Sequence, residues 1–171
     1  MKLASFLCLL ALLHAGAALL RDAPVMNASP CNASDFLNQL FTFNASQATS
    51  TLTVSPAGFP RCASVDQCLA DEGAFVSTSN ECNDSCPLGQ RFSFVDSSRK
   101  PIPGEGRGYL QTALNTSVCF GVGAELGGVQ WEARIEQGFY RFKMVGAWEA
   151  LCLASGYESD RYPINLQVCP F

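Results

Sequence analysis

Histidine is nearly absent from the chain. The only one is His14, and it lies in an N-terminal stretch that we predict to be removed from the mature protein. Without histidine, a protein lacks the usual general base for serine and cysteine nucleophiles and the usual nitrogen ligand of zinc. The sequence therefore excludes Ser-His and Cys-His catalysis, and it gives no reason to expect a metal.

Long apolar runs are missing beyond the first residues. Lys2 precedes an uncharged apolar run over residues 3–13, and small residues follow it, which is the pattern of a cleavable signal peptide. No later stretch approaches the length that a membrane-spanning helix needs, so we expect no transmembrane segment and a secreted, extracellular protein. The expected organisation is a signal peptide at 1–18, an N-terminal lead-in segment at 19–30 and a single domain at 31–171.

Positive charge is in short supply. The chain has 11 Lys and Arg against 15 Asp and Glu, a net charge of −4, and loss of Lys2 with the leader makes the mature protein one unit more negative. Nucleic acids and anionic membranes are bound by clustered Lys and Arg, so neither is expected as a partner. No pair of carboxylates is spaced as a glycosidase requires. We expect a non-enzymatic protein without a cofactor.

Cysteine, by contrast, is abundant. Of nine cysteines, Cys8 leaves with the leader, and an even number in a secreted chain indicates disulfides, here four. The residues themselves leave the pairing open among Cys31, Cys62, Cys68, Cys82, Cys86, Cys119, Cys152 and Cys169. Five Asn-x-Ser/Thr sequons predict a surface glycoprotein, and we expect two or three of them to be used: Asn27, Asn32, Asn44, Asn83 and Asn115.

The remaining sequence has the pattern of short β-strands. Apolar residues alternate with polar ones in several short runs, and Gly, Pro, Ser and Asn clusters separate these runs. No window predicts an amphipathic helix of useful length; residues 35–40 form one helical turn at most, and residues 100–108 form an exposed loop. The predicted strands are 40–43, 51–54, 75–79, 92–95, 109–112, 118–122, 129–132, 140–145, 151–154 and 165–169.

An internal repeat organises these strands. Cys, Asn, Ser, Leu, Gln, Phe and Phe of residues 31–43 recur in register in residues 82–94. A worn third copy surrounds Gln137 and Phe139. A repeat of about 50 residues that occurs about three times favours a barrel with internal threefold symmetry.

At these residues the sequence resembles the ricin-type (R-type) β-trefoil lectins. Repeats of that family carry a Cys-ending second strand and then a Gln-x-aromatic third strand, and eight residues separate Cys31 from Gln39 and Cys82 from Gln90. The resemblance covers residues 31–171. It implies an all-β, disulfide-rich β-trefoil with three repeats around a pseudo-threefold axis. It also implies two family-type disulfides and leaves two extra ones, which gives the pairings Cys68–Cys82, Cys152–Cys169, Cys62–Cys86 and Cys31–Cys119.

The resemblance further implies a sugar site. In that family, an aromatic ring stacks on the sugar while an Asp and an amide bind its hydroxyl groups. In this chain Trp131 keeps the ring and Asn38 the amide, whereas Asp71 stands one residue late. Glycans or glycoconjugates are the implied partners. The implied carbohydrate-binding residues are Trp131, Gln137, Asp71, Asn80, Asn38 and Gln39.

Each of these residues also has a structural interpretation. Trp131 fits an aromatic that lines a barrel, Asp71 fits a solvated turn, and the glutamines fit amides that bond loop backbone. The function is therefore open between two main hypotheses. One is a secreted carbohydrate-binding protein with degenerate sugar pockets. The other is a secreted β-trefoil scaffold that binds or inhibits another protein, such as a protease, through residues 100–103. A coat or matrix glycoprotein without a specific ligand is a third.

Overall fold

The computed structural model describes residues 26–31, 36–54, 61–79, 82, 86–123, 128–155 and 162–171. Within these residues the chain is all-β and contains a closed seven-strand barrel, so the prediction of an all-β fold is confirmed. Short 3-10 turns are the only helices described. The elements are β1 (Met26–Pro30), η1 (Phe36–Gln39), β2 (Phe41–Thr42), β3 (Ser50–Thr51), β4 (Thr53–Val54), β5 (Arg61–Val65), η2 (Asp66–Cys68), β6 (Val76–Ser79), β7 (Arg91–Val95), β8 (Gly106–Thr112), β9 (Val118–Val122), β10 (Trp131–Glu136), β11 (Phe139–Met144), β12 (Leu151–Ser155) and β13 (Tyr162–Val168).

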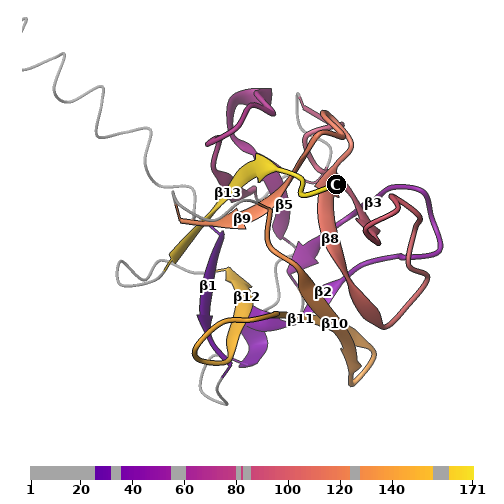
Figure 1. The fold of residues 1–171 in the computed structure, drawn as a ribbon, viewed down its shortest axis with the longest axis vertical. Coiled ribbons are helices and arrows are strands. Elements are labelled where there is room, and N and C mark those ends of the chain that lie inside the picture. The colour runs from indigo at the N-terminus through magenta and orange to yellow at the C-terminus, as the bar shows by residue number, and fades with distance from the viewer. Residues whose placement is uncertain are drawn as a thin grey trace, which may run out of the picture.

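The barrel closes between the two ends of the described chain. Its order is β1, β12, β11, β10, β8, β9, β13 and back to β1, and every neighbouring pair is antiparallel. Figure 1 shows β1 beside β12, although they lie near opposite ends of the sequence. The remaining strands extend this sheet outward from β11 and β8. Closure leaves the seven barrel strands with a partner on both sides.

Each of the ten predicted strand ranges overlaps an observed strand, but two strands were not predicted. One is β1, which occupies the end of the expected lead-in segment at 19–30; its polar residues Asn27 and Ser29 are buried. The other is β5, which contains small residues rather than an apolar run. The expected loop at 100–108 is also shorter than predicted, because β8 begins at Gly106 and Gly108 is buried against Val95 and Ile102.

Aromatic rings from three separate copies of the repeat meet in the core. The ring centroid of Phe142 lies 6.1 Å from that of Phe43 and 5.6 Å from that of Phe94. Phe43 and Phe94 occupy matching positions in the first two copies. Tyr140 and Phe142 are therefore the aromatic pair of the third copy, and Phe139, one residue earlier, lies on the opposite face of β11.

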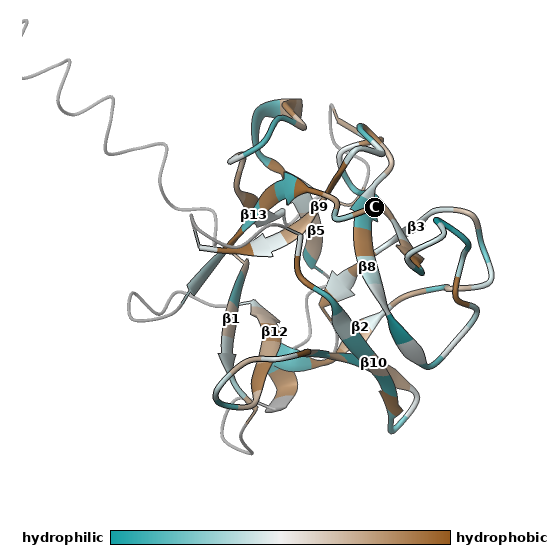
Figure 2. Cartoon of the chain, viewed as in Figure 1, coloured by the Kyte–Doolittle hydropathy of each residue, from teal (hydrophilic) through white to brown (hydrophobic). Residues whose placement is uncertain are grey.

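The hydropathy of the strands follows their depth in the fold. Every residue of β12 is buried, whereas β10 alternates between buried and accessible positions and is accessible toward its end. Figure 2 shows the same contrast, with β12 mostly hydrophobic and β10 mostly hydrophilic. The outer face of β10 is thus the surface on which charged side chains gather.

All eight cysteines of 31–171 are joined, so four disulfides are confirmed, but every predicted pairing is wrong. The pairing of β9 with β13 and of β12 with β1 brings together cysteines for which the resemblance implied other partners. The observed disulfides are Cys31–Cys152, Cys62–Cys82, Cys68–Cys86 and Cys119–Cys169. Four disulfides are typical of an oxidising, extracellular environment and fit the expected location.

In the described part of the chain, no helix has the length and apolar character needed to cross a bilayer. The predicted signal peptide lies outside the described residues.

Candidate functional site

The β10–β11 hairpin carries the charged surface of the molecule. Its two-residue turn, Gln137–Gly138, has positive φ at both positions (55° and 85°), which is the backbone of a type I′ turn and matches the twist of the strands. In the register that this turn sets, Glu132 lies opposite Lys143 and Arg134 lies opposite Arg141. These four side chains share one face, and Trp131, Ala133 and Phe142 point to the other face, into the core.

Two arginines directly opposite each other would repel, but each has a carboxylate beside it on β10. A nitrogen of Arg134 donates to Oε1 of Glu132 at 3.0 Å, and Nη1 of Arg141 donates to Oε2 of Glu136 at 3.2 Å. On this face of the hairpin, each arginine is therefore paired with a glutamate. Arg107 of β8 approaches the same Glu132 oxygen at 3.9 Å.

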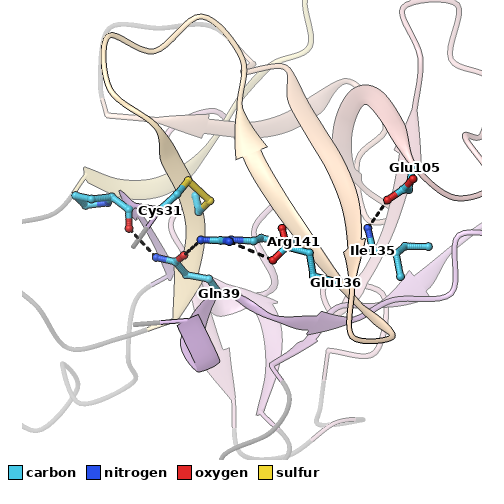
Figure 3. A network of polar contacts seen from close by, with 8 residues as sticks. Cys31, Gln39, Glu105, Ile135, Glu136 and Arg141 are labelled. Atoms are coloured by element: carbon cyan, nitrogen blue, oxygen red, sulfur yellow. Dashed lines mark hydrogen bonds and ion pairs between the residues drawn. A yellow bond between two sulfur atoms is a disulfide. The ribbon is translucent and has the colours of Figure 1, made fainter. Parts of the chain in front are cut away.

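Arg141 also reaches under the hairpin to a buried amide (Figure 3). Its Nη2 donates to Oε1 of Gln39 at 2.9 Å, and Nε2 of Gln39 donates to the Pro30 carbonyl at 2.8 Å. Gln39 is fully buried. The network ties β1, η1 and β11 together, and Ile135 N, at the far end of the hairpin, donates to Glu105 at 2.7 Å.

Two adjoining hollows lie on this charged surface. The first has a volume of about 240 Å³ and lies between Arg107, Glu132, Lys143 and the loop 144–150 that carries Trp148. The second has a volume of about 390 Å³ and extends along the hairpin to the Cys31–Cys152 disulfide. Glu132, Lys143 and Ala150 line both. We call the two hollows together the Trp148 groove; it is open to solvent, and its lining combines charged side chains with apolar surface.

Trp148 projects from the rim of the groove with its side chain fully exposed, at 107% of the reference area. The loop that carries it is held at both ends: Val145 N donates to Gln130 O at 2.9 Å, and Cys31 N donates to Ala150 O at 2.7 Å. Gly146 has φ +81°, a conformation that glycine adopts without strain. The backbone therefore holds the Trp148 ring in solvent, where the ring contributes nothing to the packing of the core.

Glu132 is the central carboxylate of the groove. The Arg134 guanidinium that bonds it, assisted by Arg107 and Lys143, holds the pKa of the Glu132 carboxyl below its usual value, although desolvation opposes the shift. The same pairing raises the pKa of Arg134. Glu132 is thus a carboxylate across the physiological pH range, and it can accept hydrogen bonds but cannot act as a general acid there.

The residues predicted for a sugar site do not come together. Trp131 is fully buried in the core and offers no ring face to a ligand, and the amide of Gln39 is spent on the buried network. Gln137 forms the hairpin turn. Asn38 and Asp71 are exposed in η1 and in a turn beside β13. None of these five lines the Trp148 groove, and Asn80 lies outside the described residues.

The groove is lined instead by residues that include Trp148, Lys143 and Arg107, which the sequence analysis did not single out. A signal for this was present in the sequence. Residues 131–134 alternate Trp, Glu, Ala and Arg, a period of two that turns Trp131 inward with Ala133. Trp148 lies outside any such alternation, between Ala147 and Glu149.

Three of the five sequons fall in the described residues, and they differ in access. Asn27 is buried within β1. The amide nitrogen of Asn115 is half-buried and donates to Ala70 O at 2.8 Å. Asn44 is exposed, and its carbonyl oxygen accepts a hydrogen bond from Ser46 Oγ at 2.6 Å. Asn44 is the sequon that the fold leaves accessible; glycosylation itself stays a prediction.

The chain was compared with protein-family models, with curated proteins and with solved structures, and none of them matches.

Proposed function

We propose that this protein is a secreted, non-enzymatic carbohydrate-binding protein and that it binds sugar in the Trp148 groove. The observation that carries the proposal is the fully exposed ring of Trp148, held by its loop at the rim of a groove that charged side chains line. An exposed tryptophan has a hydrophobic face of the size of a sugar ring. Burial of that face against the C–H side of a sugar supplies affinity that the charged surface alone lacks.

The charged side chains of the groove supply the complementary polar contacts. Glu132 accepts hydrogen bonds from sugar hydroxyl groups, and Arg107 and Lys143 donate them. The groove is small and open to solvent, so we expect weak affinity for a single sugar, in the millimolar to micromolar range that corresponds to about 4–8 kcal/mol.

A β-trefoil is the fold that we propose for the barrel and its outer strands. The meeting of Phe43, Phe94 and Phe142 in the core supports it, because it brings together one aromatic from each copy of the repeat. Three strand pairs at comparable places in the repeats, β2–β4, β7–β8 and β11–β12, support it as well. The resemblance to ricin-type lectins then favours the same class of ligand.

The alternative is a scaffold that binds or inhibits another protein through residues 100–103. Pro101 and Pro103 are exposed there, but Ile102 packs against the core and its N–H donates to Phe94 O at 2.9 Å. The central side chain of the loop is therefore unavailable to a partner. An exposed tryptophan can also anchor a protein interface, so the test must separate the two.

The test is a glycan array followed by titration of the best neutral ligand into wild-type protein, Trp148→Ala and Tyr162→Ala. Tyr162 is the matched control, because it is an exposed aromatic on β13, outside the lining of the groove. We expect Trp148→Ala to weaken binding at least about tenfold and Tyr162→Ala to leave it unchanged. An array without any competable binding, from protein with an intact β-sheet circular dichroism spectrum, would overturn the proposal in favour of a protein ligand.

A further inference from the structure

The cations of the Trp148 groove are not equivalent. Arg134 is bonded to Glu132, and Arg141 to Glu136 and Gln39. Arg107 lies at the limit of an ion pair with Glu132. Lys143 is exposed and lines both hollows, and it has no ion pair among the residues that the structure describes. It lies opposite Glu132 across the hairpin and helps to lower the pKa of that carboxyl, but no salt bridge among the described residues fixes its ammonium group.

The groove also differs in charge from the rest of the molecule. Its lining contains four cations (Arg107, Arg134, Arg141 and Lys143) and three carboxylates (Glu132, Glu136 and Glu149), a balance of +1. The whole chain has a net charge of −4. An anion approaching the protein is thus repelled by most of the surface and drawn to this hairpin.

We infer that the sugar bound in the Trp148 groove carries an anionic substituent, a carboxylate or a sulfate, and that Lys143 binds it. This inference rests on the proposed function. The sugar ring stacks on Trp148 while Lys143, which lines the same hollow, donates charge-assisted hydrogen bonds to the substituent. A neutral sugar would offer that lysine only a hydroxyl group, whereas an anionic substituent also matches its charge. Glu149, next to Trp148 on the rim, opposes the anion and limits the affinity.

The experiment compares matched ligands by isothermal titration or by nuclear magnetic resonance: lactose, 3′-sialyllactose and lactose 3′-sulfate, with methyl β-glucoside and methyl β-glucuronide as a second pair. Two charged ligands in the first set separate a carboxylate from a sulfate. The variants are Lys143→Gln, Lys143→Arg and Glu149→Gln. Lys100→Gln is the control, because Lys100 is an exposed lysine in a turn remote in sequence from the hairpin.

We expect at least one acidic ligand to bind about tenfold more tightly than its neutral counterpart, and the difference to shrink with added salt. Lys143→Gln should remove this preference, and it should weaken the neutral ligand by less than the acidic one, because a contact to a hydroxyl group lacks the charge. Lys143→Arg should retain the preference, Glu149→Gln should increase it and Lys100→Gln should not change it.

Equal binding of acidic and neutral ligands, or a preference that survives Lys143→Gln, would overturn the inference. If neutral sugars then bind and Trp148→Ala abolishes that binding, the proposed function stands without the anionic specificity. If no sugar of either kind binds, both proposals fail.

Discussion

The two tryptophans of the chain lie close to the same hairpin in opposite environments. Trp131 begins β10 and is fully buried, whereas Trp148, in the loop between β11 and β12, is fully exposed. Trp131 is directed inward because alternate positions of β10 face the core. Trp148 lies in a loop that is bonded to the barrel at both ends, and its ring projects into solvent at the rim of the groove. The comparison teaches that backbone position, not residue type, separates the ring that stabilises the fold from the ring available for recognition.

Trp131→Ala tests the structural role of the buried ring and should have the largest effect. It should reduce the free energy of unfolding by about 3–5 kcal/mol, because it leaves a large cavity beside the core aromatics. Urea unfolding of the oxidised protein measures the change, and Trp131→Phe, which refills most of the space, should cost less. A loss under 1 kcal/mol for Trp131→Ala would show that Trp131 is not a core residue.

Arg141→Met tests whether the groove rests on a buried polar support. The substitution leaves Oε1 of Gln39 buried without its donor, so we expect a loss of about 1–3 kcal/mol in the free energy of unfolding. Arg107→Gln is the matched control, because Arg107 is largely exposed and its ion pair is long. Equal effects of the two substitutions would contradict a structural role for the Gln39–Arg141 contact.

Trp148→Phe should leave stability within about 0.5 kcal/mol of the wild type, because it removes no buried contact. Fluorescence separates the two rings directly. In Trp131→Phe protein the remaining emission should be strongly quenched by acrylamide, and in Trp148→Phe protein it should resist quenching. Equal quenching of the two single-tryptophan proteins would contradict the difference in exposure between Trp131 and Trp148.

The smallest expected effect concerns the charge of Glu132. Because its pKa is lowered in the folded state, its contribution to stability is present above the unfolded pKa and is lost as the pH falls through the folded value. Carboxyl titration by nuclear magnetic resonance should place Glu132 below an ordinary glutamate, and Arg134→Gln should raise its pKa. An unchanged pKa in that variant would assign the shift to another charge.

Strands such as β7 and β11 could be predicted because they contain aromatic residues at alternate positions. The pairs Phe92 and Phe94, and Tyr140 and Phe142, have the period of two that a half-buried strand requires. β1 has no such pattern, because its buried positions include Asn27 and Ser29. The buried hydroxyl of Ser29 accepts a hydrogen bond from Nε2 of Gln39 at 3.1 Å. A partner ten residues away cannot be recognised from local periodicity.

The disulfides and the groove could not be predicted for a related reason. Cysteine spacing indicates that bonds exist, but the pairing follows from which strands become neighbours. Cys119 joins Cys169 because β9 and β13 are paired, and Cys31 joins Cys152 because β1 and β12 are paired. The groove likewise combines β8, the β10–β11 hairpin and the following loop, so no single stretch of sequence contains it.

The position of β1 has a consequence for how the protein is made. β1 lies between β12 and β13, and its residues pair with 151–155 and with 162–163. Contacts over such sequence distances make folding slow. The barrel therefore closes late in folding, and formation of the Cys31–Cys152 bond should be among the last oxidation steps. Until the barrel closes, the folding chain exposes strand edges that a chaperone would have to protect.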